Sequence, residues 1–319
     1  MLRTNVDHLA RIAVQGKVAP ALRWNPFEHD PEGGLHAVPG VGGITYNVKV
    51  GDPAFGWAGD HLEPAVSVVV DEAKRGEKAN MAFNFLACCG NEAVVISGDA
   101  KGARGVVTGH HGGVEHVMVD FSDASLERMT LDDRILVRGF GQGLRLLEHP
   151  EIHCYNLDPR LLDRWGIRAG RDGTLSVPVT TLVPGALMGS GLGFADPATG
   201  DYDITTADKR LVARHGLDAI RLGDFVALLD SDNVYGRHYR SGAVTIGIVV
   251  HSDSHLSGHG PGVATLLTAA GPRIRPVVDP RANIGRVLGI GRFRRGGRAG
   301  GARGPRGAGA ARRSTGRRR

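Results

Sequence analysis

The sequence predicts a predominantly β fold of the α+β class. Three observations lead to this prediction: short runs of β-branched residues recur along the chain, glycine separates almost all of them, and every candidate helix is short. Glycine accounts for 48 of the 319 residues, roughly twice its usual share, whereas aromatic residues make up only 5%. Because many short strands with frequent turns are typical of barrels and sandwiches, we expect two small β-barrel or sandwich-like parts with short helices.

Nine apolar runs predict strands, in chain order 43–50, 66–70, 93–97, 105–108, 114–121, 134–138, 175–181, 225–229 and 243–250. A His-His-Gly-Gly segment at 110–113 predicts a hairpin across 105–121. Helices are expected at 6–15, 72–75, 158–165, 207–215 and 263–270. The third of these has a good start signal, because Asp158 can cap it and Pro159 suits a first helical position.

The β pattern is interrupted at 148–156, and we place a boundary there. This gives an N-terminal β-rich domain over 1–150, a C-terminal β-rich domain over 151–290 and a tail over 291–319. The tail contains 11 arginines, 9 glycines and no acidic residue, which predicts disorder. Without it the chain carries 28 basic and 33 acidic residues, so the basic balance belongs to the tail. Such a tail either contacts nucleic-acid phosphates without reading sequence or is a dispensable extension.

The remaining composition predicts a soluble cytoplasmic protein. No run approaches the 18 or so apolar residues of a membrane span, and the first residues lack the apolar run of a secretory signal. Three cysteines form neither a disulfide framework nor a Cys-x-x-Cys pair, which favours a reducing compartment.

The most informative stretch for function is 242–262, where an apolar strand leads into a loop rich in histidine, serine and glycine. Its candidate metal ligands are His251, Asp253, His255 and His259. Imidazole and carboxylate suit a borderline divalent ion such as zinc, and three protein ligands with one open position suit a catalytic ion. Alternatively, these histidines are polar loop residues that hydrogen-bond to the backbone.

The same loop admits an anion site. Its candidate residues are Gly258, His259, Gly260 and Gly262. If a helix begins near residue 263, their amides lie at its positively polarised start, where anions bind. The alternative is an ordinary helix entry. A P-loop nucleotidase is excluded, because the chain lacks the Gly-x4-Gly-Lys-Ser/Thr motif.

A second glycine-bracketed loop offers candidate catalytic residues. Asp99 is a candidate proton acceptor and Lys101 a candidate partner for developing negative charge. The alternative is a solvated turn in which Asp99 bonds to its own backbone. The segment Asp60-His61-Leu-Glu63 can supply a further histidine or carboxylate, whereas Asp201-Tyr-Asp203 is expected to be a solvated turn.

Several of these motifs together resemble a bacterial and archaeal domain-of-unknown-function family with an N-terminal and a C-terminal part. The segments concerned are 59–64 (Gly-Asp-His-Leu-Glu-Pro), 90–93 (Gly-Asn-Glu-Ala), 97–102 (Ser-Gly-Asp-Ala-Lys-Gly), 156–159 (Asn-Leu-Asp-Pro), 188–191 (Met-Gly-Ser-Gly) and a block over 250–263. The resemblance covers most of 50–285 and excludes the tail. It implies one shared fold and carries no activity with it.

A local stretch, 173–188, is similar to acetamidase/formamidase enzymes, which are β-rich metal-dependent amide hydrolases. In that family a Gly-Asp-x-His segment follows, whereas here the chain continues Gly-Ser-Gly-Leu-Gly at 189–193. The similarity therefore implies β architecture only.

Two functions follow from these observations. The first is a metal-assisted hydrolase or lyase acting on a small polar substrate, with His251, Asp253, His255 and His259 as candidate ligands. The second is a non-catalytic module that binds a small anion at the 258–262 helix entry, with a homo-oligomer as a candidate assembly. Contact with nucleic acid is expected through the tail at most, and contact with a membrane is not expected.

Overall fold

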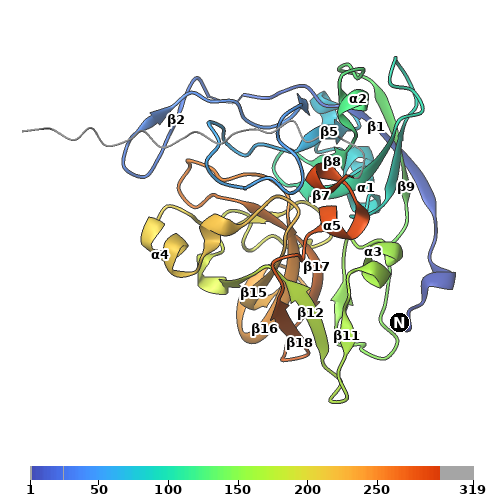
Figure 1. Cartoon of the computed structure of the whole chain (residues 1–319), viewed down its shortest axis with the longest axis vertical. Coiled ribbons are helices and arrows are strands. Elements are labelled where there is room, and N and C mark those ends of the chain that lie inside the picture. Colours follow the sequence, from blue (N-terminus) through green and yellow to red (C-terminus); the bar gives the residue numbers. More distant parts are fainter. Residues whose placement is uncertain (1, 24, 295–319) are drawn as a thin grey trace, which may run out of the picture.

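The computed structural model describes residues 2–23 and 25–294, and most of its regular structure is β. The N-terminal part is a small barrel (Figure 1). Its strands are β1 (Ile12–Val18), β5 (Ala65–Val69), β6 (Glu92–Val95), β7 (Arg104–His111), β8 (His116–Asp120) and β9 (Arg134–Gly139). They follow the order β1-β9-β6-β7-β8-β5, and an antiparallel pairing of β1 with β5 closes the ring. The short strand β4 (Ile44–Thr45) extends β5.

The barrel closes because β-branched side chains fill its interior. Val66 and Val68 of β5 are fully buried, as are Val107 of β7 and Ile135 of β9. The hairpin predicted across 105–121 is confirmed: β7 and β8 pair in antiparallel fashion from Val106 with Asp120 to His111 with His116.

The second part of the chain is built on a six-stranded sheet. Its members are β10 (His153–Cys154), β13 (Thr181–Pro184), β14 (Tyr202–Asp203), β15 (Phe225–Asp232), β16 (His238–Val249) and β17 (Gly262–Ala269). The order is β10-β17-β16-β15-β13, and β14 pairs with β17. A three-stranded sheet of β11 (Arg168–Ala169), β12 (Leu175–Val179) and β18 (Ile274–Val278) lies beside it, whereas β2 (Glu28–His29) and β3 (Leu35–His36) form a separate hairpin.

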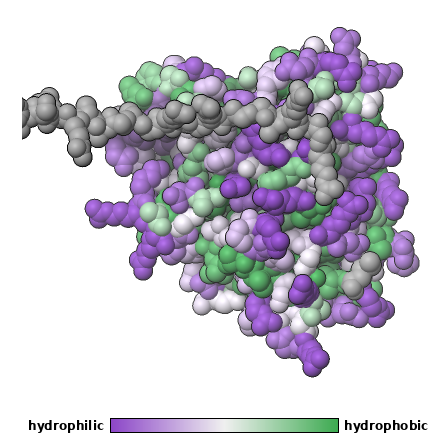
Figure 2. Space-filling model, viewed as in Figure 1, coloured by the Kyte–Doolittle hydropathy of each residue, from purple (hydrophilic) through white to green (hydrophobic). Residues whose placement is uncertain are grey.

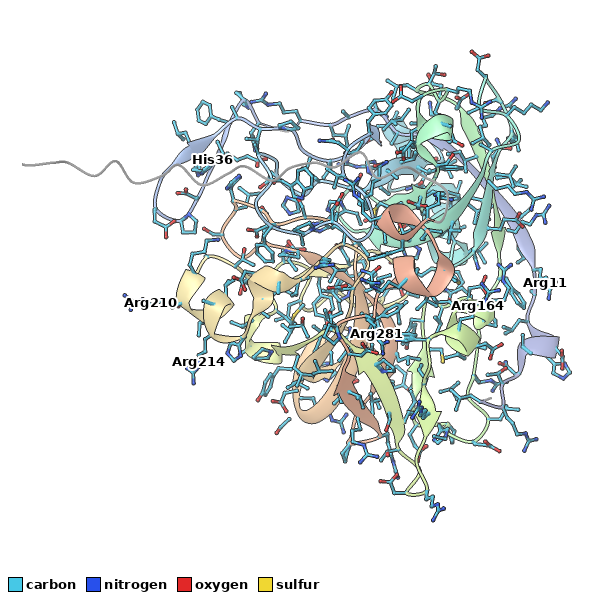
Figure 3. All side chains as sticks on the ribbon, in the orientation of Figure 1. Arg11, His36, Arg164, Arg210, Arg214 and Arg281 are labelled. Atoms are coloured by element: carbon cyan, nitrogen blue, oxygen red, sulfur yellow. The ribbon has the colours of Figure 1, made fainter. Side chains whose placement is uncertain are left out.

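The helices are few and short, as the sequence predicts. They are α1 (Lys78–Leu86), α2 (Asp123–Leu126), α3 (Pro159–Arg164), α4 (Lys209–Arg214) and α5 (Ile284–Leu288), with 3-10 turns η1 (Val6–His8), η2 (Glu72–Lys74), η3 (Gly185–Leu187), η4 (Leu217–Ala219) and η5 (Gly291–Phe293). The start signal of α3 is confirmed, since the Asp158 side chain accepts from the backbone N–H of Arg160 and Pro159 is the first helical residue. Figure 3 shows Arg210 and Arg214 projecting outward from α4.

Two of the predicted helices are strands instead. Within 6–15, only η1 is helical, and Ile12 begins the strand that closes the barrel. The segment expected as a helix over 263–270 is β17, a fully buried strand paired with β16. Its run Gly-Val-Ala-Thr-Leu-Leu-Thr-Ala is continuously apolar or small, and such a run does not distinguish a buried helix from a buried strand. The helix α1 was not predicted, and of the strand expected at 43–50 only β4 forms.

Of the tail expected at 291–319, the structure describes residues 291–294. These contain η5, and both of their arginines pair with carboxylates of the folded body: Arg292 Nε lies 2.6 Å from Asp52, and Arg294 forms an ion pair with Asp120. Residues 295–319 lie outside the described residues.

The barrel and the six-stranded sheet meet along β7 and β17. Strand β7 ends at His111 and β8 begins at His116. The loop that joins β16 to β17 lies beside this end of the barrel, where the ring centroids of His251 and His111 are 4.2 Å apart. Figure 2 shows hydrophilic residues dispersed over one face, with small hydrophobic areas between them. Among residues 2–23 and 25–294, no helix has the length and apolar content needed to cross a membrane.

Candidate metal centre

Six titratable side chains gather where the barrel meets the six-stranded sheet. They come from five separate places in the chain and are His61, His111, Asp201, Asp203, His251 and His259. Potential ligand atoms of these residues form three overlapping groups, within each of which all atoms lie no more than 4.8 Å apart. Five of the six side chains are buried, and His259 is partly exposed. A dense group of imidazoles and carboxylates of this kind is the donor set that borderline divalent metals prefer.

Three of the histidines form one of these groups. His61 lies in the loop before β5, His111 is the last residue of β7, and His251 follows β16. The His111 and His251 ring centroids are 4.2 Å apart, and those of His61 and His251 are 4.9 Å apart. The loop and the strand ends therefore bring together residues that are 190 positions apart in the sequence.

Each of these three imidazoles is held through its Nδ1 atom. Nδ1 of His61 lies 2.5 Å from Asp60 Oδ2, Nδ1 of His111 lies 2.6 Å from Glu63 Oε1, and Nδ1 of His251 lies 2.9 Å from the carbonyl oxygen of Ser252. When Nδ1 donates to these acceptors, Nε2 carries a free lone pair. Such pairing fixes the tautomer and orientation of metal-binding histidines and raises their basicity.

The two aspartates are placed by strand geometry. Asp203 lies in β14 and Asp201 directly precedes it, with Tyr202 between them. Since alternate residues of a strand point to the same side, both carboxylates face the histidines while Tyr202 enters the core. Asp203 Oδ2 lies 2.9 Å from Nδ1 of His259.

A test of whether these residues fit a metal comes from His251 and Asp201. Nε2 of His251 and Oδ2 of Asp201 lie 2.9 Å apart, yet within the described part of the chain neither atom has a partner in hydrogen-bond geometry. Both are fully buried, and unpaired buried polar atoms are rare and costly. A Cβ on Gly262 would lie 1.8 Å from Oδ2 of Asp201 and 2.2 Å from Nε2 of His251, so β17 approaches these two atoms as closely as only glycine permits. Two buried donor atoms this close together, each without a hydrogen bond among the described residues, fit a bound cation.

The electrostatics of the metal-free cluster agree with this fit. Burial opposes protonation of His61, but hydrogen bonds with Asp203 and Asp60 outweigh it and raise its pKa to about 9. The pKa of His251 is raised in the same way, against burial, by Asp201 and Asp203. Burial favours the neutral form of Asp203, yet the nearby imidazoles of His251 and His259 hold its pKa well below the usual range. The carboxylates of Asp201 and Asp203 therefore stay charged in the interior, where a positive charge beside them stabilises them.

The backbone at His61 is also unusual. Its φ is +52°, a left-handed conformation that a residue with a Cβ adopts at a cost. The conformation is maintained by a backbone hydrogen bond from His61 N–H to the Asp253 carbonyl and by the bond from Leu62 N–H to Ser252 Oγ. These bonds tie the loop that carries His61 to the loop that carries His251.

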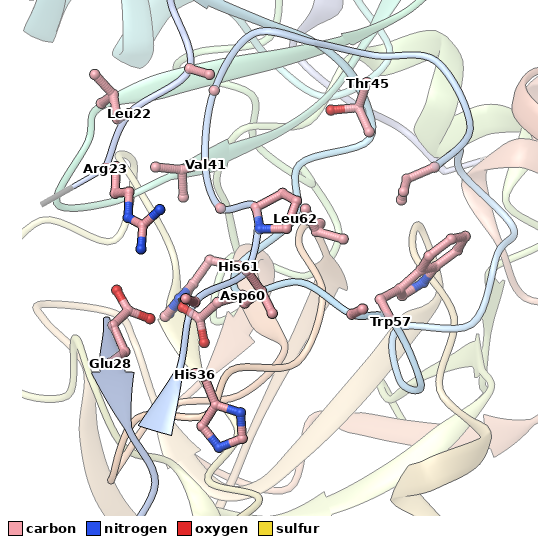
Figure 4. Close-up of a pocket in the computed structure, with 18 of the residues that line it drawn as sticks. Leu22, Arg23, Glu28, His36, Val41, Thr45, Trp57, Asp60, His61 and Leu62 are labelled. Atoms are coloured by element: carbon pink, nitrogen blue, oxygen red, sulfur yellow. Dashed lines mark hydrogen bonds and ion pairs between the residues drawn. The ribbon is translucent and has the colours of Figure 1, made fainter. Parts of the chain in front are cut away.

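A cavity of about 810 Å³ reaches the cluster at His61 (Figure 4). Arg23 and Glu28 line one side and Trp57 the other, with Asp60 and His61 between them. Within it, the carboxyl of Glu28 points toward Asp60. Burial and the negative charge of Asp60 raise the pKa of Glu28.

Two family models match the chain, one after the other. The model described as "Domain of unknown function (DUF4438), N-terminal" matches residues 27–163, and its C-terminal counterpart matches residues 164–288. The chain belongs to the DUF4438 family. The family resemblance inferred from the sequence is thus confirmed, whereas the local similarity to acetamidase/formamidase enzymes has no counterpart in these matches.

One solved structure similar to this DUF4438 chain is the crystal structure of TM1086. The two are 47% identical in sequence with a TM-score of 0.84, and the match covers 89% of this chain and 98% of that one. No curated protein matches the chain.

The structure brings together two of the four histidine-loop residues singled out in the sequence. His251 and His259 both belong to the cluster. Asp253 lies beside it, where its Oδ1 accepts from the Thr206 hydroxyl at 2.5 Å, and His255 stacks on His36 with ring centroids 3.8 Å apart. Figure 3 shows His36 on the hairpin of β2 and β3. Among the described residues, neither Asp253 nor His255 is part of a ligand group.

The helix expected after Gly262 is absent from the described chain. The glycine loop at 258–262 therefore does not lead into a helix. Gly258, His259 and Gly260 precede a strand, β17, of which Gly262 is the first residue. A strand has only a small net dipole, so the reason for expecting an anion at these amides is lost. Instead, Gly262 lets β17 pass directly against Asp201 and His251, where a Cβ would overlap both side chains.

The structure does not bring Asp99 and Lys101 to the cluster. Both are exposed in the turn between β6 and β7, before β7 begins at Arg104, whereas His111 is at the other end of that strand. An eight-residue strand spans roughly 23 Å. A proton cannot pass directly over such a distance, so these two residues are unsuited to the role expected of them.

Sequence reasoning gave too little weight to four members of the site. His111 was assigned to a turn, Asp201 and Asp203 to a solvated turn, and His61 was only a weak candidate. One available signal was the Asp-Tyr-Asp spacing, which places two carboxylates on one face of a strand. The adjacency of carboxylate and imidazole in Asp60-His61-Leu-Glu63 was another, because metal-binding histidines are commonly paired with carboxylates.

Proposed function

We propose that this DUF4438 protein is a divalent-metal-dependent hydrolase that acts on a small polar substrate. One observation carries the proposal: ring nitrogens of His61, His111 and His251 converge within 4.8 Å of one another beside a cavity, and each ring is fixed by an acceptor at Nδ1. Three imidazole ligands with an open coordination position are typical of catalytic rather than structural zinc sites.

The bound ion would supply a Lewis acid and a water molecule of lowered pKa. The surrounding residues keep its ligands in place. Asp60 and Glu63 hold the rings of His61 and His111, and the loop that follows β16 holds His251 through the Ser252 carbonyl. Because Glu63 also accepts from the backbone N–H of Gly42 and from the Ser67 hydroxyl, its own position is fixed by the barrel.

We assign proton transfer to Glu28 rather than to Asp99. The side chain of Glu28 lies in the cavity with Asp60 and His61. Burial and the nearby Asp60 raise its pKa, which keeps a proton available closer to neutral pH. A carboxyl in this position can accept a proton from an attacking water and return it to a leaving group.

The cavity lining favours a small polar or anionic substrate. Arg23 donates through Nε to the Asn25 carbonyl, and its guanidinium has further N–H groups that can pair with a carboxylate or carbonyl oxygen. Thr45 and Asn47 add hydrogen-bonding groups, and Trp57 adds an apolar wall. We therefore expect amides or esters of small acids to be substrates.

The test is metal-dependent turnover by the full-length protein. A panel of small amides and esters is offered to the purified protein, to protein treated with a chelator, and to chelated protein given back Zn²⁺, Mn²⁺ or Co²⁺. The proposal predicts hydrolysis that chelation abolishes and one of the ions restores, and that is lost in His61→Ala but retained in His255→Ala. Hydrolysis that persists without metal, or metal-loaded protein that hydrolyses no member of the panel, would contradict it.

A further inference from the structure

The two carboxylate oxygens of Asp203 face two different sets of ligand atoms. Oδ1 lies 3.4 Å from Nε2 of His251, whereas Oδ2 lies 2.9 Å from Nδ1 of His259 and 3.5 Å from Nε2 of His61. The carboxylate is buried and held in β14 by pairing with β17. Its two oxygens are thus presented in two directions by a rigid strand.

The first direction leads to the two donor atoms packed against Gly262. There Asp201, Asp203 and His251 form a ligand group of their own, and it includes the buried atoms Oδ2 of Asp201 and Nε2 of His251 that lack a hydrogen-bond partner within the described residues. This group supplies two carboxylate oxygens and one imidazole.

The second direction leads toward the cavity. There Asp203 forms another group with His61 and His259. His61 lines the cavity and His259 is partly exposed, so this group faces the solvent side of the cluster. It supplies one carboxylate oxygen and two imidazoles.

We propose that the centre holds two divalent cations bridged by the carboxylate of Asp203. This inference rests on the proposed function in requiring that the cluster bind metal, but it assigns His61 and His251, which share one ion in a singly loaded centre, to different cations. One cation lies between Asp201, Asp203 and His251, and the other between Asp203, His61 and His259. The ring nitrogen of His111 lies within ligand range of both His61 and His251, so it completes the coordination on the side where the two groups meet.

Each half of this pair has a negatively charged ligand. Asp201 serves the inner cation, and Asp203 serves both. Paired cations in hydrolytic sites lie about 3.5–4 Å apart and stabilise both the attacking and the leaving oxygen. The cation near the cavity is then the one that meets the substrate, and the inner one is shielded from it.

The experiment measures metal content and magnetic coupling in the full-length protein loaded with Mn²⁺. Elemental analysis after removal of loosely bound metal is expected to give about two equivalents per chain, and the electron paramagnetic resonance spectrum is expected to show an exchange-coupled pair. One equivalent overturns the inference and leaves the proposed metal centre standing. No bound metal overturns both, and two equivalents without coupling show that the ions are not bridged.

Single substitutions separate the two halves. His259→Ala removes a ligand near the cavity and Asp201→Asn weakens the inner group, so each is expected to retain about one equivalent and to lose the coupled signal. His255→Ala, on the same loop and outside the ligand groups of the described chain, is the matched control and should retain both. Retention of two coupled ions in both the His259 and the Asp201 variants would overturn the assignment. The wild-type measurement stands even if a variant fails to fold.

Discussion

The carboxylate of Glu63 accepts a hydrogen bond from Nδ1 of His111 at 2.6 Å, although one residue lies in a loop and the other at the end of a barrel strand. The same carboxylate lies 3.0 Å from Nδ1 of His116, whose pKa is raised to about 9 because its ion pair with Glu63 outweighs the effect of burial. Glu63 therefore fixes the orientation of His111 and is itself balanced by a protonated His116. This relationship links the interior of the barrel to the candidate metal centre.

Substitution of Glu63 tests this link. Glu63→Gln removes the negative charge that orients His111, and we expect metal affinity to fall by about 10- to 100-fold, as is usual when an outer partner of a metal ligand is lost. Titration of the metal-free variant with Zn²⁺ measures the change. Glu72→Gln is the matched control, because Glu72 contacts the far side of His116 rather than a ligand histidine. Equal losses in both variants would argue against a specific role for Glu63.

A methyl group at position 262 tests whether a cation lies between Asp201 and His251. Gly262→Ala places a Cβ 1.8 Å from Oδ2 of Asp201 and 2.2 Å from Nε2 of His251, so both side chains must move, although the backbone conformation is not one that requires glycine. We expect a folded protein with strongly reduced metal content, measured by elemental analysis and circular dichroism. Gly271→Ala, where a Cβ meets no atom within 4 Å, should retain the wild-type content. A Gly262→Ala protein that is folded and fully loaded would show that no ion occupies this space.

Metal binding should depend on pH. In the metal-free protein the pKa of His61 is about 9 and that of His251 is also raised, so both rings bind protons more tightly than free histidine does. A metal must displace these protons, and its apparent affinity should rise as the pH increases toward 9 and level off above it. Calorimetric titration with Zn²⁺ at several pH values, in buffers with different ionisation enthalpies, measures both the affinity and the proton release. An affinity that is constant between pH 6 and 9 would contradict this.

Glu28 should matter for turnover and not for metal binding. Its side chain lies in the cavity and is outside the ligand groups found among the described residues. We expect Glu28→Gln to lower kcat about 10²- to 10⁴-fold, the usual contribution of a proton-transfer group, with metal content unchanged. Glu32→Gln, on the same hairpin, should have little effect. Full activity in Glu28→Gln would assign proton transfer to another group.

Much of the fold could be predicted from the sequence because local patterns and tertiary pairing agree in most places. The cap at Asp158 and the hairpin of β7 and β8 are such cases. For β17 the local pattern is ambiguous, since its apolar run fits a helix or a strand equally well. Its pairing with β16 makes it a strand. The closure of the barrel by β1 and β5 depends likewise on a pairing between distant residues.

The candidate site could be predicted only in part, because it too depends on contacts between distant segments of the chain. His251 and His259 stand out because they lie close together in one polar loop. His61, His111 and Asp203 belong to three other segments, each far in the sequence from this loop and from one another. Their convergence depends on how the barrel docks against the six-stranded sheet, which no local spacing encodes. Asp99 and Lys101 were predicted from a local pattern, a charged loop between glycines. That loop lies at the end of β7 away from His111, so it does not reach the cluster.

The most direct test of the central claim is to locate the metal itself. Crystals of the full-length protein are soaked in Mn²⁺ or Zn²⁺, and anomalous diffraction is recorded above and below the absorption edge of the metal. We expect strong anomalous density among the ring nitrogens of His61 and His251 and the carboxylate of Asp203. Well-diffracting crystals with anomalous density only at the protein surface, and with His251 still paired to Asp201, would contradict it.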